Sequence, residues 1–354
     1  MTEQSAAAPA AAMATAWPIA KIFITGGSGY IGRNLIRHFI AKGIPVVALA
    51  RSTRSETIVT GLGATPFSGD LFSADLARGM EGCDVLIHAA ADTDHGPGTQ
   101  SQERVNEEGT RAVFEAARAA GIRRAIYLST ESVLADGRPL VNVDENHPLP
   151  RRPAGAYSRS KAAAERYALS CNGRDMTVVA IRPRFVWGRD DTTALPNLLA
   201  AVRSGQFAWI SGGDYLTTTT HIANLCHGID LAIGKGKGGQ VYFLGDDEPV
   251  RFRDFATALL ATQGIAAPDK SVPRALLRLV AGVGGLLHRL SGGKISTPLT
   301  LQSYATSAVP ITLNIGKARR ELGYAPIMDR AQGLAEMAGG ETSLSQDIDG
   351  VGAA

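Results

Sequence analysis

A tyrosine and a lysine lie four residues apart in the stretch YSRSK, at Tyr157 and Lys161. If this stretch is helical, both side chains project from one face and can reach the same site. A free phenol has a pKa near 10, and a nearby ammonium stabilises the phenolate and lowers that value. The spacing therefore predicts that Tyr157 transfers a proton and that Lys161 tunes it, although a surface tyrosine and lysine would show the same spacing.

Three glycines, Gly26, Gly29 and Gly32, punctuate the stretch TGGSGYIG between an expected strand and an expected helix. The first allows a tight turn, the second lets the backbone approach a pyrophosphate, and the third lets the helix pack closely on the strand. Backbone N–H groups at the start of the helix then face phosphate groups, where the helix dipole favours negative charge. The turn predicts a bound dinucleotide, with Tyr30 and Ile31 beside it.

The end of the second expected strand bears on which dinucleotide binds. An NAD site usually places a carboxylate there, on the ribose 2′-hydroxyl, but the strand 45–50 ends in Ala50, followed by Arg51. Nothing at that position repels a 2′-phosphate, and Arg51 could form a charge-assisted contact with one. The sequence favours NADP over NAD. The alternative is that Arg51 and Arg54 are solvated loop charges and that Glu56 serves as the acid.

Alternating apolar strands and amphipathic helices must position these residues. Strands are expected at 21–25, 45–50, up to 69–70, at 84–90, 124–130 and 176–182, and helices at 29–41, 102–120 and from 157 onward. Repeated strand–helix–strand units predict an α/β fold with a Rossmann-type doubly wound parallel sheet. Such a sheet binds its ligand at the carboxyl ends of the strands, where the strand order reverses.

The pattern is less regular after residue 182, which predicts a smaller C-terminal substrate-binding lobe. Its clearest segments are a strand at 240–245 and a helix at 251–261. The expected organisation has four parts, namely a disordered leader (1–19), a dinucleotide-binding domain with the catalytic residues (20–182), a mainly substrate-binding lobe (183–338) and a flexible tail (339–354).

Composition narrows the class of protein. The 354 residues carry 36 basic and 33 acidic side chains, a net charge of +3, which is too balanced to indicate nucleic-acid binding. The cysteines are Cys83, Cys171 and Cys226, with no CxxC spacing, so we expect no disulfide framework, no metal site and a reducing, cytoplasmic location.

The apolar segment 273–290 is interrupted by basic residues, and its uncharged run 279–287 is too short to span a bilayer. We therefore expect no transmembrane segment. A buried or substrate-covering helix is favoured, with weak contact to a membrane surface as the alternative.

Taken together, the glycine turn and the YxxxK spacing resemble the extended short-chain dehydrogenase/reductase family, also described as the NAD-dependent epimerase/dehydratase family. The resemblance implies a third catalytic group at the end of the fifth strand. Aligning STESVLA with the family pattern SSxxVxG on Val133 selects Thr130, whose hydroxyl would hold the substrate oxygen. Ser129 and Ser132 remain alternatives.

The resemblance also implies cofactor contacts from later segments. Asp70 and Leu71 match an adenine-contacting pair, and VNEEGT matches a stretch in which an Asn bonds main chain. Lys161 would hold the nicotinamide ribose, close to Tyr157. The remaining cofactor-binding residues implied are Ala89, Ala90, Ala91, Asn106 and Pro183. The segment 317–326 resembles the closing helix and turn of the family.

Segments 88–98, 195–206 and 220–232 resemble the 3β-hydroxysteroid dehydrogenase-like branch. This implies reversible hydride transfer between a nicotinamide and a secondary alcohol or ketone, with a hydrophobic, sterol- or acyl-like small-molecule substrate. His221 could border the substrate, but a structural hydrogen bond is favoured. Family members often pair through helix faces, so a homodimer is possible.

Two other functions remain open from the sequence. A sugar-nucleotide epimerase or dehydratase would use the same Tyr and Lys but would need a site for a second diphosphate, for which Arg184, Arg189 and Arg203 are candidates. A non-catalytic NADP-binding regulator is disfavoured, because such proteins often lose the Tyr or the Lys.

Overall fold

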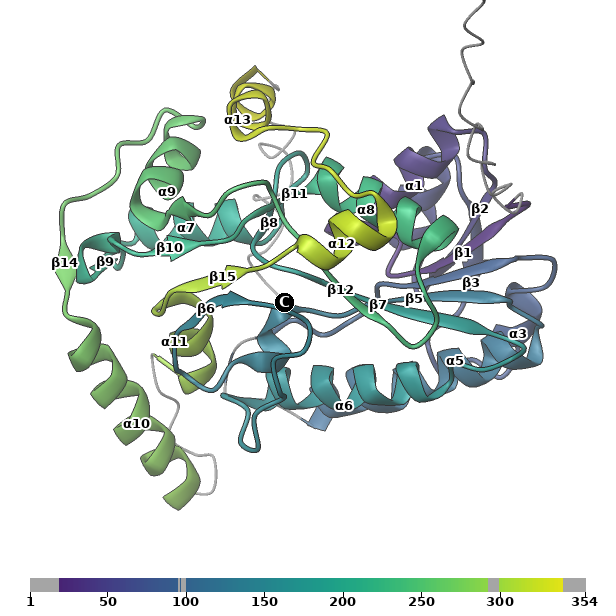
Figure 1. Cartoon of the computed structure of the whole chain (residues 1–354), viewed down its shortest axis with the longest axis horizontal. Coiled ribbons are helices and arrows are strands. Elements are labelled where there is room, and N and C mark those ends of the chain that lie inside the picture. The colour runs from purple at the N-terminus through teal and green to yellow at the C-terminus, as the bar shows by residue number, and fades with distance from the viewer. Residues whose placement is uncertain (1–18, 95, 97–99, 292–298, 340–354) are drawn as a thin grey trace, which may run out of the picture.

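The computed structural model describes residues 19–94, 96, 100–291 and 299–339. Nearly all of the expected leader and the expected tail lie outside these residues. Figure 1 shows a parallel sheet covered by helices on both faces, with a smaller part of the chain lying at the carboxyl ends of its strands. The site predicted from the sequence lies between these two parts.

The large sheet has seven strands, and every pairing within it is parallel. Their order across the sheet is β3 (Thr65–Ser68), β2 (Val46–Ala50), β1 (Ile22–Thr25), β4 (Val85–His88), β5 (Arg124–Leu128), β7 (Thr177–Pro183) and β12 (Val241–Leu244). The order reverses between β1 and β4, because the chain adds strands on one side of β1 before it crosses to the other. The predicted Rossmann-type doubly wound sheet is confirmed.

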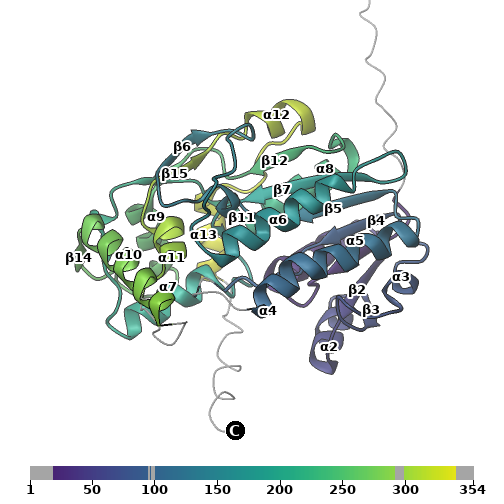
Figure 2. The same cartoon turned by 90° about the horizontal axis from the view of Figure 1, so that it is seen from below.

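The strands are buried on both faces, which explains their continuous apolar runs. In β1, Ile22 and Ile24 face one core and Phe23 faces the other, and all three are fully buried. The first core is covered by α1 (Tyr30–Ala41), α2 (Thr53–Gly61) and α8 (Ile222–Lys235). The second is covered by α3 (Leu76–Gly79), α5 (Gly109–Ala119) and α6 (Ala156–Ser170), and Figure 2 shows α5 and α6 side by side.

The helix expected at 102–120 is broken into three consecutive pieces. These are α4 (Gln100–Glu103), one π-helical stretch η1 (Arg104–Glu108) and α5. A π-turn holds an extra residue and shifts the helix face at that point, and such turns are frequent at functional sites. Here the shifted stretch contains Asn106, which is buried.

The smaller part is built on a four-stranded sheet in the order β13 (Val250–Arg251), β10 (Leu216–Thr217), β15 (Ile311–Leu313) and β6 (Leu140–Val143). Two short pairs join it, β8 (Val186–Trp187) with β11 (Thr220–His221) and β9 (Trp209–Ile210) with β14 (Ser271–Val272). The remaining described elements are the 3₁₀ turns η2 (Glu131–Leu134), which follows β5, and η3 (Ser211–Gly213), and the helices α7 (Ala194–Arg203), α9 (Phe252–Ala261), α10 (Arg274–Leu290), α11 (Leu301–Ser307), α12 (Gly316–Leu322) and α13 (Arg330–Gly339).

The two parts exchange strands. Strand β12 follows residue 182 in the chain but forms an edge of the large sheet, and β6 precedes residue 182 but pairs with β15 in the smaller one. The division at residue 182 therefore does not separate two continuous bodies. The exchange ties the expected substrate lobe firmly to the dinucleotide-binding sheet.

Helix α10 leaves much of its apolar surface in water, so the expectation of a buried helix is wrong for its outer face. Leu279 is 63% and Leu290 is 76% exposed, whereas Ala281 is fully buried. The helix contacts α11 on one side and extends away from the sheet in Figure 1. The structure thus buries only one side of the helix, where Ala281 and the half-buried Leu277 pack against the core. Within the described residues, no helix is long and apolar enough to cross a membrane.

One buried carboxylate, Asp246 in the loop after β12, ties that loop to β8, to the start of β11 and to α8. Its oxygens accept hydrogen bonds from Trp187 Nε1 (2.9 Å), Thr219 Oγ1 (2.6 Å), the His221 backbone N–H (2.7 Å) and Asn224 Nδ2 (2.8 Å). A buried charge is tolerated when hydrogen bonds replace its water in this way.

Replacing this carboxylate should destabilise the fold. Asp246→Ala leaves four buried donors without their acceptor, and we expect the free energy of unfolding to fall by about 3 kcal/mol or more. The matched control is Asp247→Ala, next along the chain, which removes one exposed pair with Arg319 and should change stability by less than about 0.5 kcal/mol. Urea denaturation of both variants measures the difference, and equal stabilities would contradict this account.

Candidate active site

The three glycines of the first turn each have a separate structural reason. Gly26 has φ +73°, and a Cβ there would lie 2.7 Å from the backbone N of Ala90. A Cβ on Gly32 would lie 2.1 Å from Gly26 O, whereas one on Gly29 would meet only that oxygen, at 3.3 Å. The fold itself thus requires Gly26 and Gly32. Gly29 is constrained less than these two, because its Cβ would meet one backbone oxygen in a tight contact without overlapping it.

At the point of strand reversal, His88 links β1 and β4 to α5. Thr110 donates to Asn106 O (2.6 Å), so it accepts from His88 Nε2 (2.9 Å), and His88 Nδ1 then accepts from Thr25 Oγ1 (2.7 Å). Burial, with a contribution from the Lys161 charge, lowers the pKa of His88 to about 3. The imidazole is therefore neutral and carries its proton on Nε2. Thr25 in turn accepts from the N–H of Ala90 (3.2 Å), which fixes the loop after β4.

Asn106 connects that loop to α6. Its Oδ1 accepts from Asp92 N (2.8 Å), and its Nδ2 donates to Asp92 O and to Ser160 Oγ, both at 3.0 Å. These main-chain bonds are the ones that the family resemblance implied. The shift of the π-turn brings a buried amide to this position, between the ends of β4 and α6.

Tyr157 and Lys161 are both buried on one face of α6, at 7% and 3% exposure. Lys161 Nζ donates to Leu128 O (2.7 Å), the last residue of β5, and lies 4.4 Å from the centre of the Tyr127 ring. Burial lowers the pKa of Lys161 to about 7, and the Glu165 carboxylate partly offsets this. The predicted pair therefore meets the carboxyl end of β5.

The pKa of the Tyr157 phenol is raised in the structure, whereas the sequence analysis expected it to be lowered. Burial raises the pKa of Tyr157 above its ordinary value, the Glu131 carboxylate raises it further, and a side-chain hydrogen bond with Thr130 lowers it. Among the protein groups, burial and Glu131 outweigh the Thr130 hydrogen bond, so the pKa is raised in the protein without cofactor.

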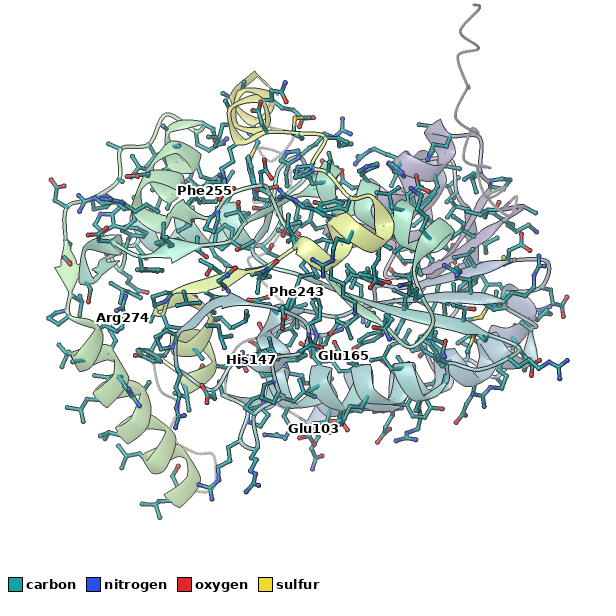
Figure 3. The ribbon with its side chains drawn as sticks, viewed as in Figure 1. Glu103, His147, Glu165, Phe243, Phe255 and Arg274 are labelled. Carbon is teal, nitrogen blue, oxygen red and sulfur yellow. The ribbon has the colours of Figure 1, made fainter. Side chains whose placement is uncertain are left out.

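Helix α6 is anchored at both ends. Near its start, the backbone N–H of Ser158 donates to Gln302 Oε1 of α11 (3.1 Å). Further along, Glu165 forms a two-bond contact with Arg182 of β7, at 2.5 and 2.8 Å, and both side chains are at most 5% exposed. Figure 3 marks Glu165 on the side of α6 that faces the sheet. The sequence indicated neither anchor.

Beside Tyr157 lies a second buried ion pair that the sequence analysis missed. Thr130 caps the turn η2, accepting from Ser132 N (3.1 Å) and donating to Glu131 Oε2 (2.9 Å). Glu131 Oε1 is 2.5 Å from Arg184 Nη1. The sequence did hold a signal, because Glu131 is a charged residue in an otherwise uncharged stretch, 125–135.

The remaining predicted cofactor residues lie at the carboxyl edge of the sheet. Arg51 is exposed after β2, and Asp70 is exposed after β3, with its carboxylate accepting from Phe72 N (2.8 Å). Leu71 is buried against α5, and Pro183 is buried at the end of β7. In the first turn of α1, Tyr30 is buried and Ile31 is half-buried; Ala89, Ala90 and Ala91 follow β4 and are half-buried.

The residues that the sequence analysis named as alternative or secondary site residues have other contacts or lie nearby. Glu56 accepts from Ser68 of β3 (2.6 Å). His221 caps α8 and its ring lies 4.7 Å from Trp187, in agreement with the favoured structural role. Arg184 is only 4% exposed in its ion pair, whereas Arg189 is exposed. Ser129 and Ser132, the alternatives to Thr130, are both buried nearby. Residues 95, 97 and 98 of the segment 88–98 lie outside the described residues.

The amino-acid sequence matches a known protein family over most of its length. The model of the 3-beta hydroxysteroid dehydrogenase/isomerase family matches residues 23–274. The chain belongs to that family.

Two curated relatives align with this family member over about nine-tenths of its length. A 4-hydroxy-2-methyl-3-oxo-4-farnesyl-3,4-dihydroquinoline-1-oxide ketoreductase of Stigmatella aurantiaca is 48% identical over 315 residues, 89% of this chain and 94% of the relative. A 3-beta-hydroxysteroid dehydrogenase of Mycolicibacterium neoaurum is 31% identical over 335 residues, 90% of each chain. The predicted branch is confirmed, and the protein is an NAD(P)-dependent oxidoreductase that acts on CH–OH groups.

Solved structures agree with the fold. The structure of gox2253 superposes with a TM-score of 0.74 at 27% identity, covering 90% of this chain and 96% of that one. A dTDP-glucose 4,6-dehydratase of Streptomyces venezuelae, with NAD bound, gives a TM-score of 0.71 at 22% identity, covering 90% and 95%. The second likeness shows the shared fold alone.

The glycine turn can be tested by a pair of substitutions. Gly32→Ala forces a methyl group against backbone, so we expect reduced stability together with loss of dinucleotide binding. Gly29→Ala should lose less stability than Gly32→Ala but bind the dinucleotide more weakly, because the methyl group occupies the approach of the pyrophosphate. Denaturation curves and fluorescence titrations with NADPH and NADH separate the two effects. A stable Gly32→Ala variant, or full affinity in Gly29→Ala, would contradict the assignment.

Proposed function

We propose that this family member transfers hydride between a nicotinamide cofactor and a secondary alcohol or ketone of a hydrophobic substrate, with Tyr157, Lys161 and Thr130 as its catalytic residues. The observation that carries the proposal is the meeting of these three side chains at the end of β5. Tyr157 is hydrogen-bonded to Thr130, and Lys161 reaches the last carbonyl of the strand from the same helix face.

The residues of the glycine turn fit a dinucleotide. Gly29 carries no side chain at the start of α1, and no side chain caps the helix N-terminus there. Free N–H groups at such an end suit a pyrophosphate. The bound cofactor supplies or accepts the hydride at its nicotinamide ring. Ala89 to Ala91 and Pro183 would border that ring, and Lys161 would hold its ribose.

The protein groups supply proton transfer and orientation. In reduction, the Tyr157 hydroxyl donates a proton to the carbonyl oxygen, and in oxidation its phenolate takes the proton of the alcohol. Lys161 stabilises the phenolate by its charge. Thr130 orients the phenol and can bond the substrate oxygen. Burial of all three side chains keeps bulk water away from the reacting atoms.

NADP is the proposed cofactor. Strand β2 ends in buried Ala50, without a carboxylate to repel a 2′-phosphate, and exposed Arg51 follows it. Asp70 and Leu71 would contact the adenine. The alternative acid, Glu56, accepts a hydrogen bond from Ser68, which supports the choice of NADP over NAD.

A hydrophobic substrate is supported by the names of the relatives and by the pairing of Arg184 with Glu131, which engages one candidate site for a second diphosphate. The relative at 48% identity is named for a farnesyl-bearing quinoline oxide, and others are named for sterols. Helix α10, which packs against α11, offers exposed leucines that could cover an apolar chain. A sugar-nucleotide epimerase is less supported, because Arg184, a candidate for its second diphosphate, is engaged with Glu131.

Replacing the phenol tests the proposed chemistry. We expect Tyr157→Phe to retain dinucleotide affinity but to lose turnover of a prenylated or steroid ketone by about 10²- to 10⁴-fold, because the proton donor is gone. The matched control is Tyr167→Phe on the same helix, whose hydroxyl contacts Glu115 away from the site. Steady-state kinetics on both variants measure the effect. Unchanged turnover in Tyr157→Phe would refute the proposed role.

Cofactor choice can be tested at Arg51. If Arg51 pairs with the 2′-phosphate, Arg51→Ala should weaken NADPH binding by about 10- to 100-fold and leave NADH binding nearly unchanged. Arg138→Ala, an exposed arginine of the smaller part, controls for a general loss of positive charge. Equal loss of affinity for both cofactors would argue against a 2′-phosphate contact.

A further inference from the structure

Helix α10 carries a stripe of exposed apolar side chains along its whole length. Its six members recur every three or four residues, which places them on one face of the helix. They are 38% to 76% exposed, and they are six of the eleven large apolar side chains that the described residues leave in water, so they form a patch rather than scattered single residues. The stripe consists of Leu276, Leu279, Val280, Val283, Leu287 and Leu290.

The opposite side of α10 fixes the helix to the protein. Ala281 is fully buried, and the half-buried Leu277 packs against the same core. Figure 3 labels Arg274 where the helix begins. Its Nε donates to Ala308 O (2.5 Å), and its guanidinium lies 5.4 Å from the centre of the Tyr215 ring. Because these contacts hold the helix in place, the stripe faces outward in the folded chain.

The ionisable residues of α10 are all basic. They are Arg274, Arg278, His288 and Arg289, and the sequence of the helix contains no Asp or Glu. Arg278 is exposed, and no carboxylate pairs with it within the described part of the chain. The exposed acids that precede the helix are themselves engaged, because Asp214 pairs with Arg251 and Asp269 pairs with Arg253. The surface beside the stripe therefore carries positive charge.

A shallow hollow lies on the exposed side of the helix, at the border between its charge and its apolar stripe. It is lined by Ala275, Arg278, Leu279, Gly282 and Val283. The small residues leave room between the larger apolar side chains, and the guanidinium of Arg278 borders that room. A phospholipid has the complementary arrangement, because its apolar chains are joined to a phosphate.

We propose that the stripe of α10 docks this protein on the surface of an anionic lipid bilayer, with the helix lying in the plane of the membrane. A helix that is apolar on one face and basic beside it binds at this interface, where anionic headgroups attract its charge. The 17 residues of α10 extend over about 25 Å, and all of the stripe can leave water without any part of the chain crossing the bilayer. This inference does not depend on the proposed function.

Two other occupants fit the stripe less well. A second copy of the chain would bring two all-basic helices together, and like charges across an interface are unfavourable. An apolar substrate chain could cover part of the stripe, but it offers no negative charge to Arg278. An anionic bilayer matches both the length of the apolar surface and the sign of the charge.

Sedimentation of the full chain with lipid vesicles, without substrate or cofactor, tests the proposal. We expect it to pellet with phosphatidylglycerol and phosphatidylcholine mixed in equal parts, less with phosphatidylcholine alone, and less at high salt. Leu279→Asp/Val283→Asp should weaken binding by about tenfold or more, because charges replace apolar groups that leave water. The matched control is Val141→Asp/Ile327→Asp, which adds the same charge at similarly exposed apolar residues and should bind like the wild type.

A second variant tests the charge without changing the stripe. Arg278→Gln should weaken binding to the anionic vesicles about fivefold, whereas Arg118→Gln, at an exposed arginine of α5, should leave it unchanged. Urea denaturation establishes that each variant is folded.

Three results would overturn the proposal. The first is a wild-type protein that stays in solution with the anionic vesicles. The second is equal vesicle binding by the wild type and Leu279→Asp/Val283→Asp, or equal binding to both lipid compositions. The third is a stable dimer in size-exclusion chromatography that the two aspartates dissociate while no vesicles are bound, which would assign the stripe to a second copy of the chain.

Discussion

The position of α6 against the end of β5 is the constraint on which the site depends. A helix carries Tyr157 and Lys161 on one face, but only its placement brings that face to Thr130. Three contacts fix it, namely the Lys161 bond to Leu128 O, the Gln302 contact at the helix start and the buried pair of Glu165 with Arg182. Because these contacts come from β5, α11 and β7, the helix can neither slide nor rotate without breaking one of them.

Two buried Glu–Arg pairs have different structural roles. Such pairs seldom stabilise a fold more than well-packed apolar residues would, because desolvation offsets the attraction. The pair of Glu165 and Arg182 joins helix to sheet and leaves a carboxylate one turn from Lys161, which limits the fall of the lysine pKa. The pair of Glu131 and Arg184 instead joins the turn after β5 to the smaller part of the chain. The lobe that would bind substrate is thereby linked to the proton donor.

The sequence predicted the parts of the molecule that repeat. Each strand of the parallel sheet is a short apolar run, and the glycine turn has its own spacing, so the doubly wound parallel sheet, the tight turn after β1 and the shared face of Tyr157 and Lys161 could be predicted from the sequence. Features made by distant residues could not. The π-turn at Asn106, the contact of Gln302 with α6 and the strand exchange of β6 and β12 depend on tertiary pairing, which leaves no local periodicity.

The exposed face of α10 shows why pattern alone misjudged that helix. Its apolar residues suggested burial, but burial needs a partner surface, and within the described residues the helix packs mainly against α11. Ala281 and the half-buried Leu277 reach the core, while others, such as Leu279, face water. An apolar surface held out in this way is costly unless something covers it during function. The long apolar chain of the proposed substrate would be one such cover.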